Sequence, residues 1–306
     1  MPSLVSDVGG TNTRLALVDA QGRLSAAPRR YRNDEHGDFL SVARTFLREE
    51  GQPDLTKACI AIAGPVSVKS ARLTNRDWAF DAGSLADGLS VSGVNLINDI
   101  VALGYGLSAL APDQLLALRD GAVPTGNGQR LVVGIGTGLN VCMAKDDPRG
   151  PVILEAEFGH SSLPVSVASC LDAAVPNASA TFPTAETLLA GRGISTLFRV
   201  MTGQDGVGAH DVSARAAEGG AAHDCLMLAA ELCGLLTRDI YLHYMPGDGI
   251  YFAGSVARTL LQGPYAGAFL SAFKLSGQFE QDLAQVPLSL ITDDLAALAG
   301  CARALG

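Results

Sequence analysis

The sequence predicts an α/β fold that contains two related halves. Its 306 residues are enough for two domains of ordinary size, and a composition of 48% hydrophobic and 17% charged residues is typical of a folded globular protein. Short apolar runs that end at glycine alternate with stretches of helical spacing. In addition, a pattern of strand, glycine turn and strand occurs near the start and again near the middle. Such a mixture favours a sheet that is covered by helices.

The first third of the chain alternates strands with helices. Apolar runs that glycine interrupts or closes predict the strands, as at Gly64-Pro65. Helical spacing that stops at a glycine predicts a helix, as at Gly51. The predicted strands are residues 3–8, 14–19, 58–64 and 94–97, and the predicted helices are residues 39–51 and 100–110.

The remainder begins with the second strand-turn-strand pattern, in residues 130–144. After residue 166 the pattern is mostly helical. Residues 249–254 predict a last strand, and residues 295–305 predict a closing helix. The recurrence of the hairpin indicates an old duplication, in which each half offers one loop to a shared cleft. Its period is too long for a solenoid.

The charge and the cysteines limit the classes of partner and of compartment. A formal net charge of −9 argues against a surface that attracts nucleic acid or anionic membrane, so a phosphate site would be local. Six scattered cysteines without a C-x-x-C pair indicate reduced thiols. Met1-Pro2-Ser3 leads directly into a predicted strand, without room for a signal peptide, and no apolar stretch is long enough to cross a bilayer. We therefore expect a soluble, cytoplasmic protein.

Two glycine turns carry hydrogen-bond donors that could hold phosphate. Glycine lets the backbone approach an anion closely, and each hydrogen bond to a charged group contributes about 1.5–3 kcal/mol. Each turn alone could equally be a tight hairpin turn. The presence of two such turns, with an aspartate ahead of the first, favours phosphate. The donors are Gly9, Gly10, Thr11 and Asn12 in the first turn and Gly136, Thr137 and Gly138 in the second.

Asp7 stands two residues ahead of Gly9 in the first glycine turn and suits a magnesium site. Its carboxylate would meet the ion through water, because Mg²⁺ keeps several of its own water ligands. Other well-known phosphate loops do not match. The sequence has no G-x-x-x-x-G-K-[ST], and "GIGTGL" lacks the third glycine of the dinucleotide fingerprint and precedes a strand.

Asn98 and Asp99 stand where a predicted strand ends and a helix begins. Asn and Asp are favoured helix N-caps, which is a sufficient structural reason for them. The functional interpretation is that Asp99 accepts the proton of an attacking hydroxyl while Asn98 holds a neighbouring hydroxyl. Both are compatible, since ligands of open α/β sheets bind at strand ends.

Two further side chains suit a polyol, whose adjacent hydroxyls need both donors and acceptors. Glu157 and His160 lie in the loop-like segment "EAEFGHSSLP", where a surface glutamate and a structural histidine are the alternative. Glu186 begins a predicted helix and could be only a favourable acid of the first turn.

In these motifs the chain resembles bacterial glucokinase, the ATP-dependent hexokinase type of the actin-like sugar kinases. The resemblance spans nearly the whole chain, and its motifs occur in the expected order. They are "DVGGTNTRLALVD", "CIAIAGPV", "LTNRDWAF", "LINDIVAL", "GIGTGLNV", "EFGHSSLP", "AETLLAGRGI" and "GIYFAGSVAR".

The resemblance implies a two-domain actin-like ATPase (ribonuclease H-like) fold with a cleft between the domains. The small α/β domain would comprise residues 1–104 and 293–306, and the large α/β domain residues 105–292. The family also suggests a homodimer. The two glycine turns would then face each other across the cleft, with Asp99 at its floor.

The resemblance also assigns roles to the candidate residues. Asp99 would be the catalytic base for the sugar 6-hydroxyl, and Trp78 would pack behind the sugar site. The other sugar contacts would be Asn75, Asn98, Gly138, Glu157, His160 and Glu186. The nucleotide would be held by Asp7, Gly9, Gly10, Thr11, Asn12, Arg14, Gly136, Thr137, Gly138 and Gly254, the last beside the adenosine.

The implied activity is transfer of phosphate from Mg²⁺-bound ATP to the 6-hydroxyl of glucose. A kinase for another hexose or for an N-acetylated amino sugar would keep every motif. A sugar-responsive regulator is disfavoured, because no DNA-binding domain fits ahead of the first turn. A silent ATP-binding sensor would not need Asp99 and Glu157 together. Three positions depart from the family. Cys170 stands alone where related proteins carry a cysteine-rich zinc motif, so no zinc is expected. Asn140 replaces a glycine, and Ser255 replaces the second glycine of another motif.

Overall fold

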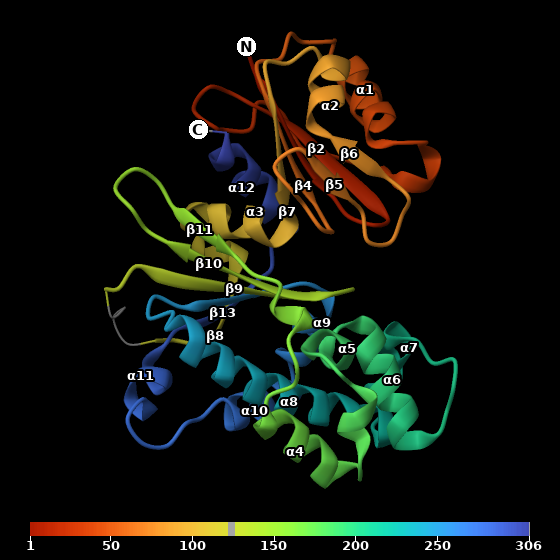
Figure 1. Cartoon of the computed structure of the whole chain (residues 1–306), viewed down its shortest axis with the longest axis vertical. Helices are drawn as coiled ribbons and strands as arrows, with labels where there is room; N and C mark the ends of the chain where they lie inside the picture. The colour runs from red at the N-terminus through yellow and green to blue at the C-terminus, as the bar shows by residue number, and fades with distance from the viewer. Residues whose placement is uncertain (122–125, 306) are drawn as a thin grey trace. The chain divides into compact units, whose positions relative to one another are not determined.

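The computed structural model describes residues 1–121 and 126–305, which form two compact units (Figure 1). Unit 1 comprises residues 1–111 and the C-terminal residues from Asp293, and unit 2 comprises residues 112–292. The boundary expected at 104/105 falls inside helix α3 (Asp99–Gly106), whereas the division between the units follows Ala111.

Unit 1 contains a five-stranded sheet in the order β3-β2-β1-β4-β7. The first glycine turn joins β1 to β2 as an antiparallel hairpin, as predicted, while β4 and β7 run parallel to β1. The register aligns Val8, Ile62 and Asn98 across these three parallel strands. Neighbouring strands are about 4.8 Å apart, so Val8 and Asn98 lie about 10 Å apart at one edge. The strands are β1 (Ser3–Val8), β2 (Asn12–Val18), β3 (Arg29–Arg32), β4 (Ala58–Ile62) and β7 (Val94–Asn98).

Helices cover both faces of the unit 1 sheet (Figure 1). On one face lie α1 (Phe39–Glu49) and α2 (Ala82–Leu89), with the small hairpin of β5 (Ser70–Arg72) and β6 (Ala79–Asp81). On the other face α3 packs against α12 (Ala296–Ala304), which comes from the far end of the chain. These two helices touch closely, because a Cβ added to Gly300 would lie 1.7 Å from the carbonyl oxygen of Ala102.

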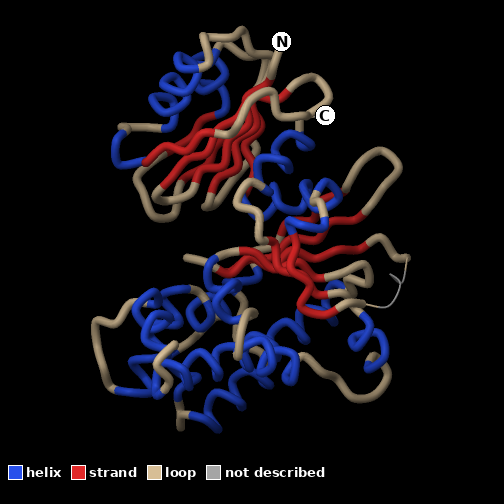
Figure 2. The backbone as a smooth tube through the Cα atoms, turned by 180° about the vertical axis from the view of Figure 1, so that it is seen from behind, coloured by secondary structure: helices blue, strands red, loops and turns tan. Residues whose placement is uncertain are grey.

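The unit 2 sheet repeats the topology of unit 1. Its order is β11-β10-β9-β12-β13-β8, and the second glycine turn joins β9 to β10 as an antiparallel hairpin. Figure 2 draws the strands of both sheets in red, with the helices in blue. The strands β12 and β13 then run parallel to β9, as β4 and β7 do to β1. Five strands of each unit therefore share one order and one set of directions, and β8 adds a sixth strand, antiparallel to β13, to the sheet of unit 2. The strands are β8 (Leu115–Arg119), β9 (Gln129–Ile135), β10 (Leu139–Lys145), β11 (Val152–Glu155), β12 (Ile250–Ala253) and β13 (Leu288–Ile291).

The expectation that residues 249–254 form the last strand was wrong. The strand β13 follows it and pairs with both β12 and β8. It has only four residues, Leu-Ser-Leu-Ile, and a run this short does not distinguish strand from helix. The pairing with β12 decides it.

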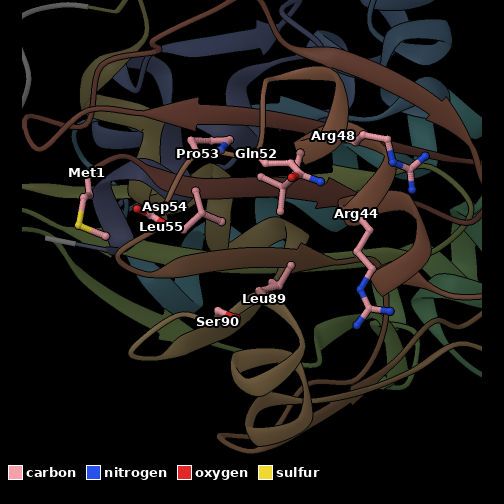
Figure 3. A pocket seen from close by; sticks show the side chains of 10 residues that line it. Met1, Arg44, Arg48, Gln52, Pro53, Asp54, Leu55, Leu89 and Ser90 are labelled. Atoms are coloured by element: carbon pink, nitrogen blue, oxygen red, sulfur yellow. The ribbon is translucent and has the colours of Figure 1, made fainter.

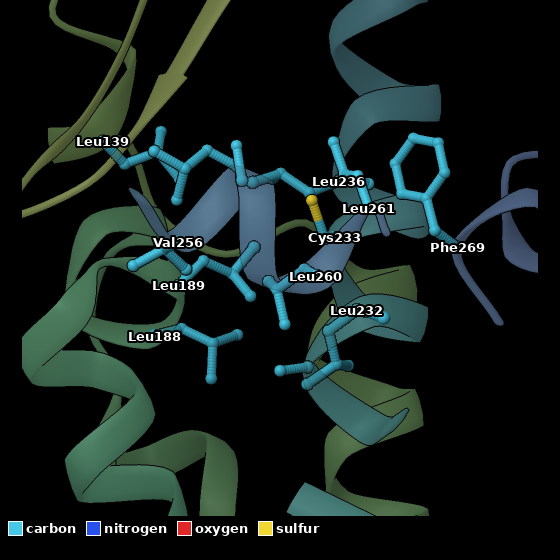
Figure 4. Close-up of a cluster of buried hydrophobic side chains, with 14 of the residues drawn as sticks. Leu139, Leu188, Leu189, Leu232, Cys233, Leu236, Val256, Leu260, Leu261 and Phe269 are labelled. Carbon is cyan, nitrogen blue, oxygen red and sulfur yellow. The ribbon is translucent and has the colours of Figure 1, made fainter. Parts of the chain in front are cut away.

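Unit 2 is mostly helical after residue 166, as predicted. Its core includes Leu189, Cys233 and Phe269, which come from three helices and belong to one cluster of buried side chains (Figure 4). The helices are α4 (Val165–Ala174), α5 (Ala185–Leu189), α6 (Gly191–Thr202), α7 (Ala209–Ala216), α8 (Gly220–Tyr244), α9 (Ser255–Leu260), α10 (Tyr265–Ala272) and α11 (Glu280–Gln285). Short 3-10 turns occur at Asn33–Glu35, Leu107–Ala109, Pro112–Gln114, Phe158–His160 and Ala178–Thr181. Within the described residues, no helix combines the length and the apolar character needed to span a membrane.

Candidate functional site

The first glycine turn, residues 9–12, is braced from behind by a buried asparagine. The N–H of Gly9 donates to the carbonyl oxygen of Asn12 at 3.0 Å, which closes the turn. Asn33 has no exposed surface; its Nδ2 donates to the oxygen of Gly9 at 2.7 Å, and its Oδ1 accepts from the Thr13 hydroxyl at 2.8 Å. The sequence analysis missed Asn33, because a single polar residue after a short strand carries no periodic signal.

Asp7 lies opposite Arg14 in the first hairpin and forms an ion pair with it. Nη1 of Arg14 lies 3.1 Å from Oδ2 of Asp7, and Nη2 lies 3.6 Å from Oδ2 of Asp294. Burial raises the pKa of Asp7, while the guanidinium of Arg14 opposes that shift. A carboxylate that borders the glycine turn fits a water-mediated contact to Mg²⁺, which takes one or two carboxylates and completes its shell with water and phosphate oxygens.

The segment around Asn75 adjoins the first glycine turn. A Cβ added to Gly10 would lie 3.4 Å from the Cβ of Asn75, and Nε of Arg76 donates to the oxygen of Gly10 at 3.4 Å. The guanidinium of Arg76 also lies over the ring of Trp78, 5.4 Å from its centroid. Trp78 is buried in the core of unit 1, so it supports this segment from behind.

The cap of α3 is Asn98, and Asp99 is the first residue of the helix. Oδ1 of Asn98 accepts from the N–H of Ile100 at 2.9 Å, while its Nδ2 donates to the oxygen of Gly64 at 3.1 Å. The half-buried Asp99 places Oδ1 3.0 Å from the same N–H. A carboxylate in the first helical turn is favoured by the helix dipole. The capping role considered for Asp99 therefore belongs mainly to its neighbour.

The second glycine turn, residues 136–138, meets three other segments of unit 2. The N–H of Gly191 donates to the oxygen of Gly136 at 2.8 Å. Gly254 has a φ of +99°, and a Cβ there would lie 2.3 Å from the oxygen of Ile135. Only glycine fits at that position, so the start of α9 lies directly against the turn.

Glu186 lies against the same turn rather than pointing away from it. Its Oε2 accepts from the N–H of Leu139 at 2.9 Å, and a Cβ added to Gly138 would lie 2.8 Å from that oxygen. The side chain of Thr184 caps α5 and so sets the start of the helix that carries Glu186. This glutamate thus does more than complement the helix dipole.

The loop that carries Glu157 and His160 rests on β10. A Cβ at Gly159 would lie 1.9 Å from the oxygen of Leu139, which leaves no space for a side chain there. Asn140 donates from Nδ2 to Oε2 of Glu157 at 3.2 Å, and its Oδ1 accepts from the N–H of Phe158 at 3.0 Å. Both Glu157 and His160 are exposed.

The structure thus brings the predicted residues together in two groups, one in each unit. In unit 1 the first glycine turn, Asp7 and Asn75 adjoin, and Asn98 and Asp99 lie at the same edge of the sheet. In unit 2 Glu157, Glu186 and Gly254 all surround the second hairpin. Among the residues that the structure describes, no group of three or more His, Cys, Asp or Glu side chains could hold a metal ion.

Two hollows of the surface lie outside these groups. One, of about 440 Å³, lies in unit 1 beside Arg44 and Arg48 and includes none of the predicted site residues (Figure 3). The other, of about 350 Å³, lies in unit 2 and is bounded by Phe158 and His243. It adjoins the loop of Glu157 without including that residue.

Comparison with known proteins identifies the family of this chain. A sequence model of the Glucokinase family matches residues 4–306. The glucokinase of Erwinia tasmaniensis is 30% identical over 307 residues, which cover 97% of this chain and 95% of that protein. The crystal structure of a glucokinase from an Antarctic psychrotroph is similar with a TM-score of 0.83 at 25% identity, over 99% of this chain and 98% of that one.

A more distant structure shares the fold. The ROK family glucokinase of Streptomyces griseus, solved with glucose and AMPPNP, has a TM-score of 0.66 at 19% identity and covers 99% of both chains. The fold is the two-domain actin-like ATPase fold that the sequence predicted. The chain therefore belongs to the glucokinase family and is a kinase that phosphorylates a sugar with ATP.

Proposed function

We propose that this chain transfers the γ-phosphoryl group of Mg²⁺-bound ATP to the 6-hydroxyl of glucose, producing glucose 6-phosphate and ADP. The observation that carries the proposal is the position of Asp99. It follows the last residue of β7, two strands from the end of β1 and the first glycine turn, at the carboxyl edge of the sheet. Ligands of open α/β sheets bind at this edge.

In the proposed reaction Asp99 acts as general base. The sugar 6-oxygen forms a bond to the γ-phosphorus, the bond from that phosphorus to the oxygen that bridges it to the β-phosphate breaks, and the hydroxyl proton moves to the Asp99 carboxylate. General-base help contributes about 10²–10⁴-fold to such reactions. Positioning and charge stabilisation supply most of the remainder.

The nucleotide would be held by the two glycine turns. Their backbone N–H groups, together with Arg14, would bind the phosphates, and Asp7 would meet Mg²⁺ through water. When bound, that ion neutralises charge on the phosphates. Gly254 would lie beside the adenosine. The contact of Gly254 with the second glycine turn and the position of Asp7 beside the first support these roles.

A set of polar side chains would hold the sugar hydroxyls. Each offers an amide, an imidazole or a carboxylate, the groups that recognise vicinal hydroxyls. The contacts of Asn75 and Glu186 with the glycine turns, and the place of Asn98 at the end of β7, support this assignment. They are Asn75, Asn98, Glu157, His160 and Glu186, with Gly138 supplying backbone.

We also assign the enzyme to the cytoplasm and expect a homodimer, with no nucleic acid or membrane as a partner. All six cysteines are free thiols, which suits a reducing compartment. The dimer rests on the family resemblance.

A panel of sugars tests the proposed function. The purified chain is supplied with Mg²⁺-ATP and glucose, mannose, fructose or N-acetylglucosamine in parallel, and both ADP and sugar phosphate are measured. Glucose should show the highest kcat/KM, with little ADP formed when no sugar is present. A higher kcat/KM for another hexose or for the N-acetylated sugar would reassign the substrate. ADP formation that ignores added sugar would contradict a sugar kinase.

A further inference from the structure

We propose that Asn140 is a positioning residue that sets the orientation of the Glu157 carboxylate for sugar binding. The inference rests on the proposed function, in which Glu157 contacts a sugar hydroxyl. It adds to that site a residue that acts through Glu157 and is not itself among the proposed contacts of sugar or nucleotide.

Asn140 is the second residue of β10, directly after Leu139. Its Oδ1 accepts from two backbone N–H groups, that of Val141 at 2.9 Å and that of Phe158 at 3.0 Å. Because both of these groups only donate, the amide cannot be turned over without losing both bonds. Its Nδ2 must therefore face Glu157, where it donates to Oε2 at 3.2 Å.

This arrangement holds one rotamer of a side chain that would otherwise move freely. Glu157 is exposed, and an exposed glutamate samples several rotamers. The amide engages a single oxygen of the carboxylate, which can accept from about four directions. The remaining directions stay available for hydroxyl groups. Asn140 thus orients Glu157 without consuming its capacity to bind.

The loop has a second attachment that does not involve Asn140. Gly159 packs directly on the oxygen of Leu139, which attaches the loop to β10. Within the loop, the N–H of His160 donates to the oxygen of Glu157 at 3.2 Å. Replacement of Asn140 should therefore leave the loop in place while releasing the carboxylate. This separation makes the positioning role measurable.

The test compares Asn140→Asp and Asn140→Ala in the full chain. Asn140→Asp keeps the acceptor for the two backbone N–H groups but turns a second carboxylate toward Glu157. We expect the KM for glucose to rise about tenfold or more in both variants, as for loss of a hydrogen bond to a charged group. The kcat should change less than about threefold, because the lost interaction holds glucose equally in the ground state and in the transition state. The KM for ATP should not change.

Asn127→Asp is the matched control. Asn127 likewise accepts at Oδ1 from a backbone N–H, that of Gln129, and donates from Nδ2 to a carbonyl, that of Met245. It lies outside both groups of proposed site residues, and the substitution adds the same charge. Its glucose KM should equal that of the wild type. An equal rise in KM for Asn127→Asp and Asn140→Asp would overturn the inference.

Two further variants separate this inference from the proposed function. Glu157→Gln should raise the KM for glucose, and combining it with Asn140→Asp should restore a donor opposite an acceptor, so that the double variant loses less than the two single effects together. A normal glucose KM in Glu157→Gln would refute the sugar-binding role of Glu157 and the inference with it. A raised KM in Glu157→Gln beside a normal KM in both Asn140 variants would overturn the inference alone. If Asn140→Asp does not fold, Asn140→Ala decides.

Discussion

The division of work between Asn98 and Asp99 determines what their substitution should do. Asn98 caps α3 and also donates to the oxygen of Gly64, so its side chain joins two segments of unit 1. Asp99 begins the helix, and its Oδ1 accepts from the same N–H of Ile100 that Asn98 already satisfies. Stability should therefore depend on Asn98, whereas the chemistry of the proposed reaction should depend on Asp99.

Asp99→Asn should lower kcat for glucose by at least about 10²-fold, because an amide cannot accept the hydroxyl proton. The thermal midpoint should change little, since the cap is retained. Initial rates at saturating ATP and glucose, together with a thermal melt, check both parts. A collapse of the midpoint with normal activity per folded molecule would make Asp99 a structural residue.

At the scale of the element, each unit contains a hairpin of the same kind. In each unit an antiparallel hairpin with a glycine turn leads into two parallel strands, and the turn is braced by a neighbouring segment. In unit 1 the face of the sheet below the hairpin depends on α12, which arrives from the C-terminus and packs on α3. The close approach of these helices requires glycine at two positions, Gly106 and Gly300.

Gly300→Ala should destabilise unit 1 by about 1–3 kcal/mol, because the added Cβ would overlap the oxygen of Ala102 and force the helices apart. Gly267→Ala is the control, since Gly267 is an exposed glycine within α10 with no atom near an added Cβ. It should stabilise by about 0.5–1 kcal/mol. Urea unfolding measures both, and equal effects of the two substitutions would contradict close packing of α12 on α3.

The cap of α2 should make stability depend on pH. Hydrogen bonds from the backbone and hydroxyl of Ser84 lower the pKa of Asp81 below its ordinary value of 3.8. Because the pKa of Asp81 is lower in the folded state than in the unfolded chain, the ionised carboxylate stabilises the fold above pH 3.8. This contribution is lost as the pH falls through the lowered pKa. The free energy of unfolding should therefore exceed that of Asp81→Ala by a constant amount above about pH 5 and converge in acid. A difference that is unchanged across this range would speak against the cap.

At the scale of the whole molecule, the net charge affects how copies of the chain associate with one another and with other charged molecules. A net charge of −9 keeps copies soluble and opposes contact with polyanions. The proposed homodimer would form against this repulsion, so its interface would have to gain more free energy from burial than the like charges cost.

Sedimentation equilibrium tests the homodimer. We expect twice the 31.6 kDa of one chain, with a smaller apparent mass at low salt and low concentration, where repulsion is less screened. A mass of one chain at every concentration and salt would refute the dimer. The measurement needs no substrate, so its outcome is independent of the proposed reaction.

Sequence patterns predicted those elements whose signal is local. The spacing of apolar residues and the positions of glycines predicted both glycine hairpins, the buried strand β4 and the helix α1. The same patterns missed β13, whose four residues become a strand only by pairing with β12. They also missed the bracing role of Asn33, a residue 24 positions from the glycine that it supports.

The chain alone was sufficient to identify the family and the α/β class, because ordered motifs and apolar periods are properties of neighbouring residues. It was also sufficient to name Asp99, Glu157 and Glu186 as candidates. Which of Asn98 and Asp99 caps α3, and that Asn140 holds Glu157, could be learned only from the folded protein. Such contacts join atoms that strand pairing and loop packing bring together. A pattern of neighbouring residues does not specify which distant residues will lie within hydrogen-bond distance.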